Sequence, residues 1–147
     1  MGFTHSVVIA APVERVWHCI DDLELRKQWQ QGLEETLYTH VPAQGGPVGT
    51  RFTARIREGG RVTVYQGEVL AHEPGRLLRM RMGDRHFTLL NTVRLAAEGP
   101  GTRLELEVAT TLHSWPARLL RPLSALLLRA MARKQLAALK TLAEGGG

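Results

Sequence analysis

The chain has 147 residues, of which 44% are hydrophobic and 22% charged, and this composition supports one domain with a single hydrophobic core. No apolar stretch approaches the length of a membrane span, and the first six residues lack the basic cluster of a signal peptide, so we expect a cytoplasmic protein. The formal net charge of +5 leaves nucleic acid, an anionic membrane or an acidic ligand as partner classes.

The N-terminal stretch changes from a strand pattern to a helix pattern at Pro12. Residues 3–10 include consecutive β-branched residues and predict a strand. Pro12 fits the first turn of a helix, where its missing N–H is not needed. Apolar residues then share one helical face, namely Val13, Val16, Trp17 and Ile20. The pair Asp21–Asp22 provides an N-cap for a second short helix, which has Trp29 on its inner side.

Beyond residue 33 the hydrophobicity alternates with a period of two, which is typical of half-buried antiparallel strands. The pattern is clearest where Phe52, Ala54 and Ile56 alternate with polar residues. Turns that contain glycine separate the strands at residues 58–61, 74–75, 83–84 and 98–101. Successive strands joined by short turns predict an antiparallel meander.

The strand at residues 61–72 has no single clear phase. Val62 and Val64 indicate one buried face, whereas Tyr65 indicates the other. A β-bulge near Gly67 would reconcile the two patterns. The orientation of the Tyr65 side chain therefore stays open at this point.

The last predicted element is a long amphipathic helix. Pro116 opens it, and residues 117–143 are rich in the helix formers leucine, alanine, arginine and lysine. Pro122 ends a first turn or kinks the helix. The apolar face comprises Leu120, Leu123, Leu127, Met131, Ala138 and Leu142. The opposite, basic face comprises Arg118, Arg129, Arg133 and Lys140. Because no repeat or linker interrupts the chain, we expect residues 1–144 to form one domain and glycines 145–147 to form a flexible tail.

These elements predict an α+β fold. A curved antiparallel sheet with one apolar face needs a cover, and the C-terminal helix is the one predicted element long enough to provide it. We expect that helix to lie across the concave face, with the two short helices closing one end. The space between sheet and helix would accommodate a small apolar molecule.

Five segments, taken in order, resemble the SRPBCC superfamily, which includes START-like lipid-transfer domains, birch-pollen-allergen-type proteins and bacterial polyketide cyclases/dehydrases. The segments are IAAPVERVWHCIDDLELRKQW, GPVGTRFTAR, GEVLAHEPGRLL, GTRLELEVATTL and LAALKTLAE, and together they span nearly the whole chain. The resemblance implies the helix-grip fold: a seven-stranded curved antiparallel sheet, two short helices after the first strand, and a long C-terminal helix across the concave face. Because this fold hosts several functions, the resemblance implies a type of cavity rather than one reaction.

No motif identifies a metal site or a catalytic centre. The six histidines do not pair with one another, a cysteine or a carboxylate at ligand spacing, so we expect no metal and no cofactor. Cys19 lies among apolar helix positions and is expected to be a buried, unreactive thiol. Glu68 and His72 are four residues apart on one strand and would share a face. We expect both to be solvated, unless the bulge is absent and Glu68 faces the cavity.

The residues expected to line the cavity are mostly apolar. They are Trp29, Phe52, Tyr65, Met80, Met82, Phe87, Leu89, Asn91, Thr110, Leu127, Met131 and Gln135. The flexible methionines suit an adaptable apolar surface. Asn91 and Thr110 fall on the inward phase of otherwise apolar strands, and a buried amide without a partner costs about 1–3 kcal/mol. A neighbour, a water or a ligand must therefore bind the Asn91 amide.

Much of the positive charge has a structural explanation. Arg51, Arg55 and Arg57 lie on the outer face of one strand and Glu105 and Glu107 on that of another, so cross-strand ion pairs are expected. The basic face of the last helix is most simply its solvated back. A transient contact with an anionic membrane is the alternative, because leucines lie beside the arginines. No nucleic-acid-binding module is visible, and both a monomer and a homodimer remain open.

The sequence favours a binding protein that encloses a small hydrophobic or aromatic ligand, lipid-like or polyketide-like, without a cofactor. The resemblance keeps two alternatives open. One is a cofactor-free cyclase or dehydratase of the polyketide aromatase/cyclase type. The other is a protein-interaction domain related to heat-shock ATPase activators, which predicts a well-filled interior.

Overall fold

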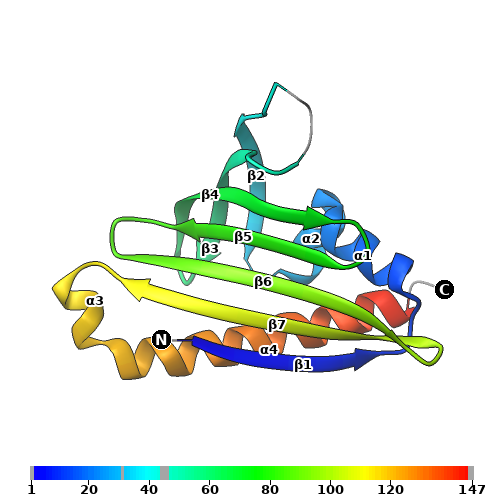
Figure 1. The fold of residues 1–147 in the computed structure, drawn as a ribbon. Helices are drawn as coiled ribbons and strands as arrows, with labels where there is room; N and C mark the ends of the chain where they lie inside the picture. The colour runs from blue at the N-terminus through cyan, green and yellow to red at the C-terminus, as the bar shows by residue number, and fades with distance from the viewer. Residues whose placement is uncertain (1, 31, 44–46, 146–147) are drawn as a thin grey trace.

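In the computed structural model, which describes residues 2–30, 32–43 and 47–145, seven strands form one antiparallel sheet (Figure 1). In chain order the elements are β1 (Gly2–Ile9), α1 (Val13–Asp21), α2 (Leu23–Trp29), β2 (Leu33–His40), β3 (Arg51–Glu58), β4 (Arg61–Glu73), β5 (Leu77–Gly83), β6 (Phe87–Glu98), β7 (Gly101–Leu112), α3 (Trp115–Leu119) and α4 (Arg121–Gly145). Strands β2 to β7 form the predicted meander, and β1 completes the sheet by pairing with β7. This is the helix-grip arrangement that the sequence predicted.

The two short helices are arranged as the sequence predicted. Helix α1 begins directly after Pro12. Asp22 is the N-cap of α2, because its carboxylate accepts hydrogen bonds from the backbone N–H groups of Glu24 and Leu25 at 2.9 and 3.0 Å. These bonds satisfy donors that have no partner within the helix. The cap permits α2 to start immediately after α1, so the pair closes one end of the sheet.

A register shift between Val69 and Ala71 resolves the phase of β4. The bulge exists, but it lies beyond Gly67 rather than beside it. Before the bulge the side chain of Tyr65 is buried on the inner face. The extra residue then reverses the alternation, so Glu68 and His72 lie on opposite faces, and the expectation that they share one is wrong. His72 packs edge-on against Trp17 and contacts the Asp21 carboxylate at 3.0 Å.

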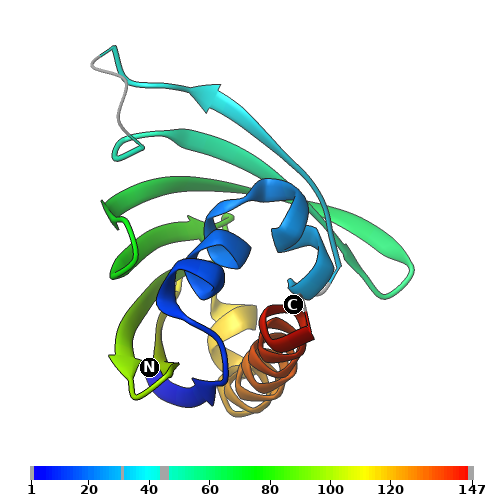
Figure 2. The same cartoon turned by 90° about the vertical axis from the view of Figure 1, so that its right-hand side faces the viewer.

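The sheet curls around the helices, and α4 lies in its hollow beside β1 (Figure 2). Helix α4 packs against β1, α1 and α2, which places it along one side of the concave face. The helical segment predicted from residue 117 is divided into α3 and α4 by a break at Leu120, so Pro122 ends a first short turn, which was one of its two predicted effects. Gly145 is the last residue of α4, and the other two glycines of the expected tail lie outside the described residues.

Among the described residues, no helix is both long and apolar enough to cross a membrane.

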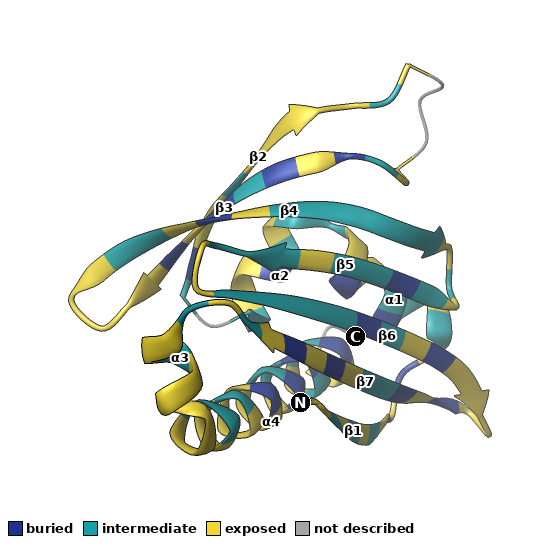
Figure 3. Cartoon of the chain, turned by 60° about the vertical axis from the view of Figure 1, so that its left-hand side comes forward, coloured by how far each residue is buried: buried dark blue, intermediate teal, exposed yellow. Residues whose placement is uncertain are grey.

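The buried face of α4 differs from the predicted one. Its buried residues are Ala132, Leu136, Leu139 and Ala143. These positions lie one residue after the predicted set, which corresponds to a rotation of about 100° around the helix. Of the predicted face, Ala138 and Leu142 are half-buried, whereas Leu120, Leu123 and Leu127 are exposed (Figure 3). Leucines between residues 119 and 128 occupy too many sides of the helix for the pattern to define one face.

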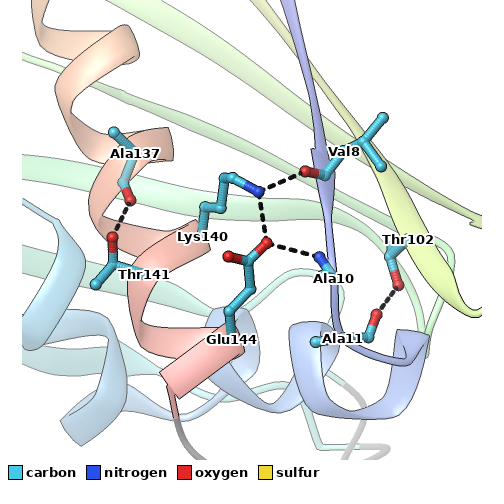
Figure 4. A network of polar contacts seen from close by, with 8 residues as sticks. All are labelled: Val8, Ala10, Ala11, Thr102, Ala137, Lys140, Thr141 and Glu144. Carbon is cyan, nitrogen blue, oxygen red and sulfur yellow. Dashed lines mark hydrogen bonds and ion pairs between the residues drawn. The ribbon is translucent and has the colours of Figure 1, made fainter.

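Polar contacts at the C-terminal end of α4 fix this rotation (Figure 4). The Glu144 carboxylate accepts a hydrogen bond of 2.7 Å from the backbone N–H of Ala10 and a second one from the Lys140 ammonium. The same ammonium donates to the Val8 carbonyl at 3.0 Å. From α1, the Arg15 guanidinium donates to backbone carbonyls in the last turns of α4. Lys140, predicted on the solvent face, therefore joins the helix to β1.

Replacing Glu144 by glutamine tests this anchor through its pH dependence. The hydrogen bond from the Ala10 backbone and the Lys140 ammonium lower the pKa of the Glu144 carboxyl, so folding favours its ionised form. Such a group adds stability above its unfolded pKa of about 4.3 and loses that contribution as the pH falls through its folded pKa. We expect the wild type to be more stable than Glu144→Gln near neutral pH, with the difference shrinking in acid. Urea unfolding at a series of pH values measures it.

Glu35→Gln is the control for this experiment, because Glu35 is an exposed carboxylate on β2, away from α4. We expect a smaller effect on the free energy of unfolding from this change. A Glu144→Gln effect that stays constant from neutral to acidic pH would contradict the anchoring role of the charge.

Candidate functional site

A cavity of about 190 Å³ lies between the inner face of the sheet and α4. Two clusters of buried side chains flank it. One joins α1, α4, β1 and β7 around residues such as Ile20, Leu104 and Leu139. The other joins β2, β3 and β4 around residues such as Ile56 and Tyr65. Residues of both clusters contribute to the wall, so the cavity is the gap that the two clusters leave between them.

Nine of the twelve predicted lining residues form part of this wall. They are Trp29, Tyr65, Met80, Met82, Phe87, Leu89, Asn91, Met131 and Gln135. They come from α2, β4, β5, β6 and α4, so segments that are far apart in sequence meet at one site. The three remaining predicted residues, Phe52, Thr110 and Leu127, are not part of the wall.

Phe52 lies on the inner face, as predicted, but its ring covers Gly67 on the neighbouring strand. Phe52 and Gly67 are directly paired between β3 and β4. A Cβ atom built on Gly67 would lie 2.4 Å from Cζ of Phe52 and 2.9 Å from the carbonyl oxygen of Arg81. Only glycine leaves room for the ring there, because any side chain would occupy the same space. The aromatic ring is thus part of the second core cluster.

Thr110 and Leu127 are absent from the wall for different reasons. Thr110 is buried and pairs with Leu89, but the cavity does not reach it. Leu127 is 54% exposed because of the helix rotation described above. The next residue, Leu128, takes the place expected for Leu127 and lines the cavity.

Sequence reasoning missed several wall residues, and for some of them a signal was present. Leu104, Leu106 and Val108 lie on the inward phase of β7, which the alternation already indicated. Glu58 continues the inward series of Phe52, Ala54 and Ile56 to the last residue of β3. A charged residue at the end of a strand was assigned to the turn, so its contribution to the wall was not expected.

The phenol of Tyr65 donates a hydrogen bond to Oε1 of Glu58 at the cavity wall. Tyr65 is 7% exposed, and its ring packs against that of Phe87 with the centroids 5.6 Å apart. Burial and the neighbouring Glu58 carboxylate raise the pKa of the Tyr65 phenol far above its usual value. The phenol therefore stays protonated and donates its O–H to Glu58, whose second carboxylate oxygen can accept a further hydrogen bond.

Trp29 is held in the wall by contacts between α2 and α1. Its indole Nε1 donates to the carbonyl of Cys19 at 2.8 Å. One turn earlier on α2, the buried guanidinium of Arg26 donates to the carbonyl of Ile20 at 2.9 and 3.1 Å. These bonds satisfy carbonyls at the C-terminal end of α1, which have no partners within that helix. Sequence reasoning did not assign Arg26 a role.

Two amides face the cavity from opposite sides. Asn91 lies on β6, and Gln135 lies on α4. Within the described part of the chain, neither side chain has a hydrogen-bond partner, and no fully buried polar side-chain atom lacks one. The two amides are therefore open to the cavity, where a water or a ligand can bind them.

Metal-binding and nucleophilic chemistry have little support among the described residues. No group of three or more His, Cys, Asp or Glu side chains is placed there to hold a metal ion. Cys19 is buried in the first core cluster, and burial raises the pKa of its thiol. A raised pKa reduces the thiolate fraction, so Cys19 is poorly suited to act as a nucleophile.

Ion pairs on the outer face of the sheet account for most of its arginines. Glu68 lies 2.9 Å from Arg81 and 3.9 Å from Arg51. Arg57 pairs with Glu34 at 2.7 Å. Both Glu105 and Glu107 lie 3.6 Å from Arg94. Cross-strand pairs are present, but Arg51 and Arg57 pair with Glu68 and Glu34 rather than with Glu105 or Glu107. Among the described residues Arg55 has no ion pair. Glu68 points away from the cavity.

The sequence profile of a family described as "Polyketide cyclase / dehydrase and lipid transport" matches residues 2–144. The chain belongs to this family. Membership confirms the resemblance to the SRPBCC superfamily and implies a hydrophobic ligand-binding cavity, in agreement with the apolar wall described above. No curated protein matches the chain.

Solved structures of similar fold cover essentially the whole chain. Protein TTHA0849 from Thermus thermophilus is 22% identical to this chain and superposes with a TM-score of 0.77. The alignment covers 100% of this chain and 99% of TTHA0849. Protein CV1439 from Chromobacterium violaceum is 20% identical with a TM-score of 0.74, covering 98% of each chain. Ara h 8.0201 is 12% identical with a TM-score of 0.72, covering 97% of each chain. At identities of 12–22%, these similarities show that the chain shares its fold with the three solved structures.

Gly67→Ala tests whether Phe52 depends on the absence of a side chain on β4. The new methyl group would meet the Phe52 ring and a backbone carbonyl, so we expect a loss of about 1–3 kcal/mol in the free energy of unfolding. Gly60→Ala is the matched control, since a Cβ there has no atom within 4 Å among the described residues, and we expect a change below about 0.5 kcal/mol. Chemical denaturation compares both variants with the wild type. Equal stability of Gly67→Ala and Gly60→Ala would refute the packing argument.

Proposed function

We propose that the protein binds a small hydrophobic or aromatic molecule, lipid-like or polyketide-like, in the cavity between the sheet and α4. The observation that carries the proposal is an apolar cavity with two amides, Asn91 and Gln135, that have no described protein partner. Apolar walls with a few convergent polar groups are characteristic of ligand sites. The proposal includes a cytoplasmic location and requires no cofactor.

The size of the cavity limits the ligand. Its volume of about 190 Å³ exceeds the roughly 150 Å³ of an engineered apolar cavity that binds benzene. It is smaller than the roughly 300–1,000 Å³ typical of sites for drug-sized molecules. One aromatic ring or a short acyl segment therefore fits without movement of the wall. A larger ligand requires the flexible side chains of Met80, Met82 and Met131 to move.

Burial of apolar surface would supply most of the affinity. At about 25 cal/mol per Å², covering roughly 200 Å² of ligand surface contributes on the order of 5 kcal/mol. Hydrogen bonds to Asn91 and Gln135 would orient the ligand, because each amide can both donate and accept. The Tyr65 phenol and the Glu58 carboxylate provide a further polar point on the wall.

One observation favours an enzyme as the second candidate. The hydrogen-bonded pair of Glu58 and Tyr65 brings a carboxylate and a phenol to the wall of an apolar cavity, and the carboxylate is a group that can act as a general base. The protein-interaction alternative predicted a well-filled interior, and the cavity argues against it. Identification of the retained molecule separates the first two: a cyclised or dehydrated product supports the enzyme.

Blocking the cavity tests the binding proposal. Ala132 is buried in the wall on α4, and Ala130 is exposed on the same helix. Ala132→Phe places a ring in the cavity, so we expect the retained small molecule to be lost, at a stability cost of about 1–3 kcal/mol. Ala130→Phe adds the same ring on the outer side and should retain the molecule. Native mass spectrometry of the purified proteins, followed by extraction, measures occupancy.

Circular dichroism and thermal unfolding establish that both variants are folded before occupancy is compared. Retention of the same molecule by folded Ala132→Phe would refute binding in the cavity.

Asn91→Leu tests the orienting role of the Asn91 amide. Leucine has a similar volume but cannot form a hydrogen bond, so a ligand with a polar group should bind roughly tenfold more weakly. A purely apolar ring of the same size should bind with equal or higher affinity. Titration calorimetry with such a pair, for example phenol and toluene, measures the difference. A more stable variant with unchanged affinity for phenol would show that Asn91 does not orient the ligand.

A further inference from the structure

A patch of large apolar side chains is exposed on α3 and the first half of α4. We call it the apolar patch, and it comprises Trp115, Leu119, Leu120, Leu123, Leu126 and Leu127. The exposed fractions reach 74% for Trp115, 72% for Leu119 and 63% for Leu126. Figure 3 shows this end of the helical segment as mostly exposed, whereas the buried residues of α4 lie in its C-terminal half. So many neighbouring exposed leucines are unusual on a monomer surface and indicate an interaction site.

The net positive charge of the chain is concentrated in the same segment. Residues 113–143 contain six lysines and arginines and no aspartate or glutamate. The remainder of the chain carries 13 lysines and arginines against 14 aspartates and glutamates. The helical segment therefore accounts for the whole formal excess of positive charge.

The basic residues beside the apolar patch also differ in their pairing from those on the sheet. On the sheet, Arg57, Arg81 and Arg94 each lie near a glutamate. Among the described residues, no ion pair involves the basic residues of the first part of the segment, which are Arg118, Arg121, Arg129, Arg133 and Lys134. Arg118 donates a hydrogen bond to the Leu112 carbonyl, and Arg129 lies over the Phe3 ring, but neither contact neutralises the charge. The charges of the exposed Arg121, Arg133 and Lys134 are available to an external anionic partner.

From the apolar patch and the basic residues of the same helical segment, we propose that α3 and the first half of α4 dock on the surface of an anionic lipid membrane. Leucine side chains would enter the boundary of the acyl chains, and the arginines would contact lipid phosphates. Trp115 suits this boundary, since tryptophan prefers the interface between lipid and water.

A second copy of the chain fits this surface less well. A symmetric dimer brings the same patch of both copies together, so the basic residues around it would face their own counterparts. Like charges in apposition oppose association, and no carboxylate in residues 113–143 offsets them. Charge complementarity therefore favours an anionic membrane over self-association.

The patch continues along α4 into the cavity wall. Leu126 and Leu127 belong to the patch, and Leu128 and Met131 line the cavity. A docked protein would thus present the cavity-lining part of α4 near the lipid, which provides a short route for a hydrophobic molecule between bilayer and cavity. Docking itself does not require a ligand, so it can be tested separately from the proposed binding function.

Sedimentation with vesicles tests the docking. One set is phosphatidylcholine with about one third phosphatidylglycerol, and the other is pure phosphatidylcholine. We expect binding to the anionic vesicles that weakens as the salt rises from about 0.1 to 0.5 M, because salt screens exposed charges. A blue shift of the fluorescence that Trp115→Phe abolishes would place this end of the helix in the lipid. Equal binding to both vesicle types, or none, would overturn the proposal.

Matched charge variants locate the contact. Arg121→Gln/Arg133→Gln removes two exposed charges near the patch, and Arg55→Gln/Arg61→Gln removes two exposed charges on the sheet. At about 1 kcal/mol per basic residue, the first pair should weaken vesicle binding on the order of thirty-fold. The loss of vesicle affinity caused by the second pair should be several times smaller. Equal weakening by both pairs would show that net charge, not this surface, governs binding.

The double variant Leu123→Gln/Leu126→Gln tests the apolar contribution at two exposed positions. It should reduce vesicle binding at least tenfold with unchanged thermal stability, because neither side chain is in the core.

Sedimentation equilibrium without vesicles completes the test. A wild-type dimer that these substitutions convert to a monomer would assign the patch to self-association and overturn the membrane proposal. Persistent docking of the cavity-blocked Ala132→Phe protein would support docking even if the cavity proposal fails.

Discussion

The packing of the C-terminal half of α4 against β1 and α1 is the interaction on which the other features of the molecule depend. Leu136 and Leu139 bury the inner side of this half in the first core cluster. Lys140 contacts the backbone of β1 at Val8, and Glu144 contacts the backbone at Ala10, just after β1. With its end held in this way, the helix has one rotation available, and that rotation determines which residues face the cavity and which face solvent.

The cavity follows from where this anchor lies. Because α4 is held to the β1 side of the curled sheet, the β2–β4 side must build its own small core around Tyr65 and Phe52. The two clusters do not close completely on each other, and the space between them is the cavity. Local backbone features adjust its shape: Gly67 accepts the ring of Phe52, and the bulge after Val69 reverses the face on which later β4 residues lie.

The distribution of charge separates two surfaces of the protein. On the outer face of the sheet, arginines and glutamates of neighbouring strands neutralise one another, so that face needs no partner to balance it. On α3 and the first half of α4 the cations lack acidic neighbours and share the segment with exposed leucines. The anchor explains this contrast as well, since the half of α4 that it leaves unsupported is the half that carries the apolar patch.

The sequence by itself determined the elements, their order and the fold. Strand alternation around Phe52 and the Asp22 cap depend on neighbouring residues, which a local pattern records directly. For the same reason, inward strand positions such as Met80 and Asn91 were assigned correctly to the concave side, where they line the cavity.

The tertiary structure alone decided how distant elements meet. The rotation of α4 depends on contacts of Lys140 and Glu144 with the backbone of Val8 and Ala10, more than 130 residues away in sequence, so a helical wheel placed Leu127 inward by mistake. The place of the bulge in β4 depends on its pairing with β5, which the single strand does not encode. The cavity lies where the two core clusters do not pack fully against each other. Its volume depends on how all the surrounding side chains pack, and no local sequence pattern records that.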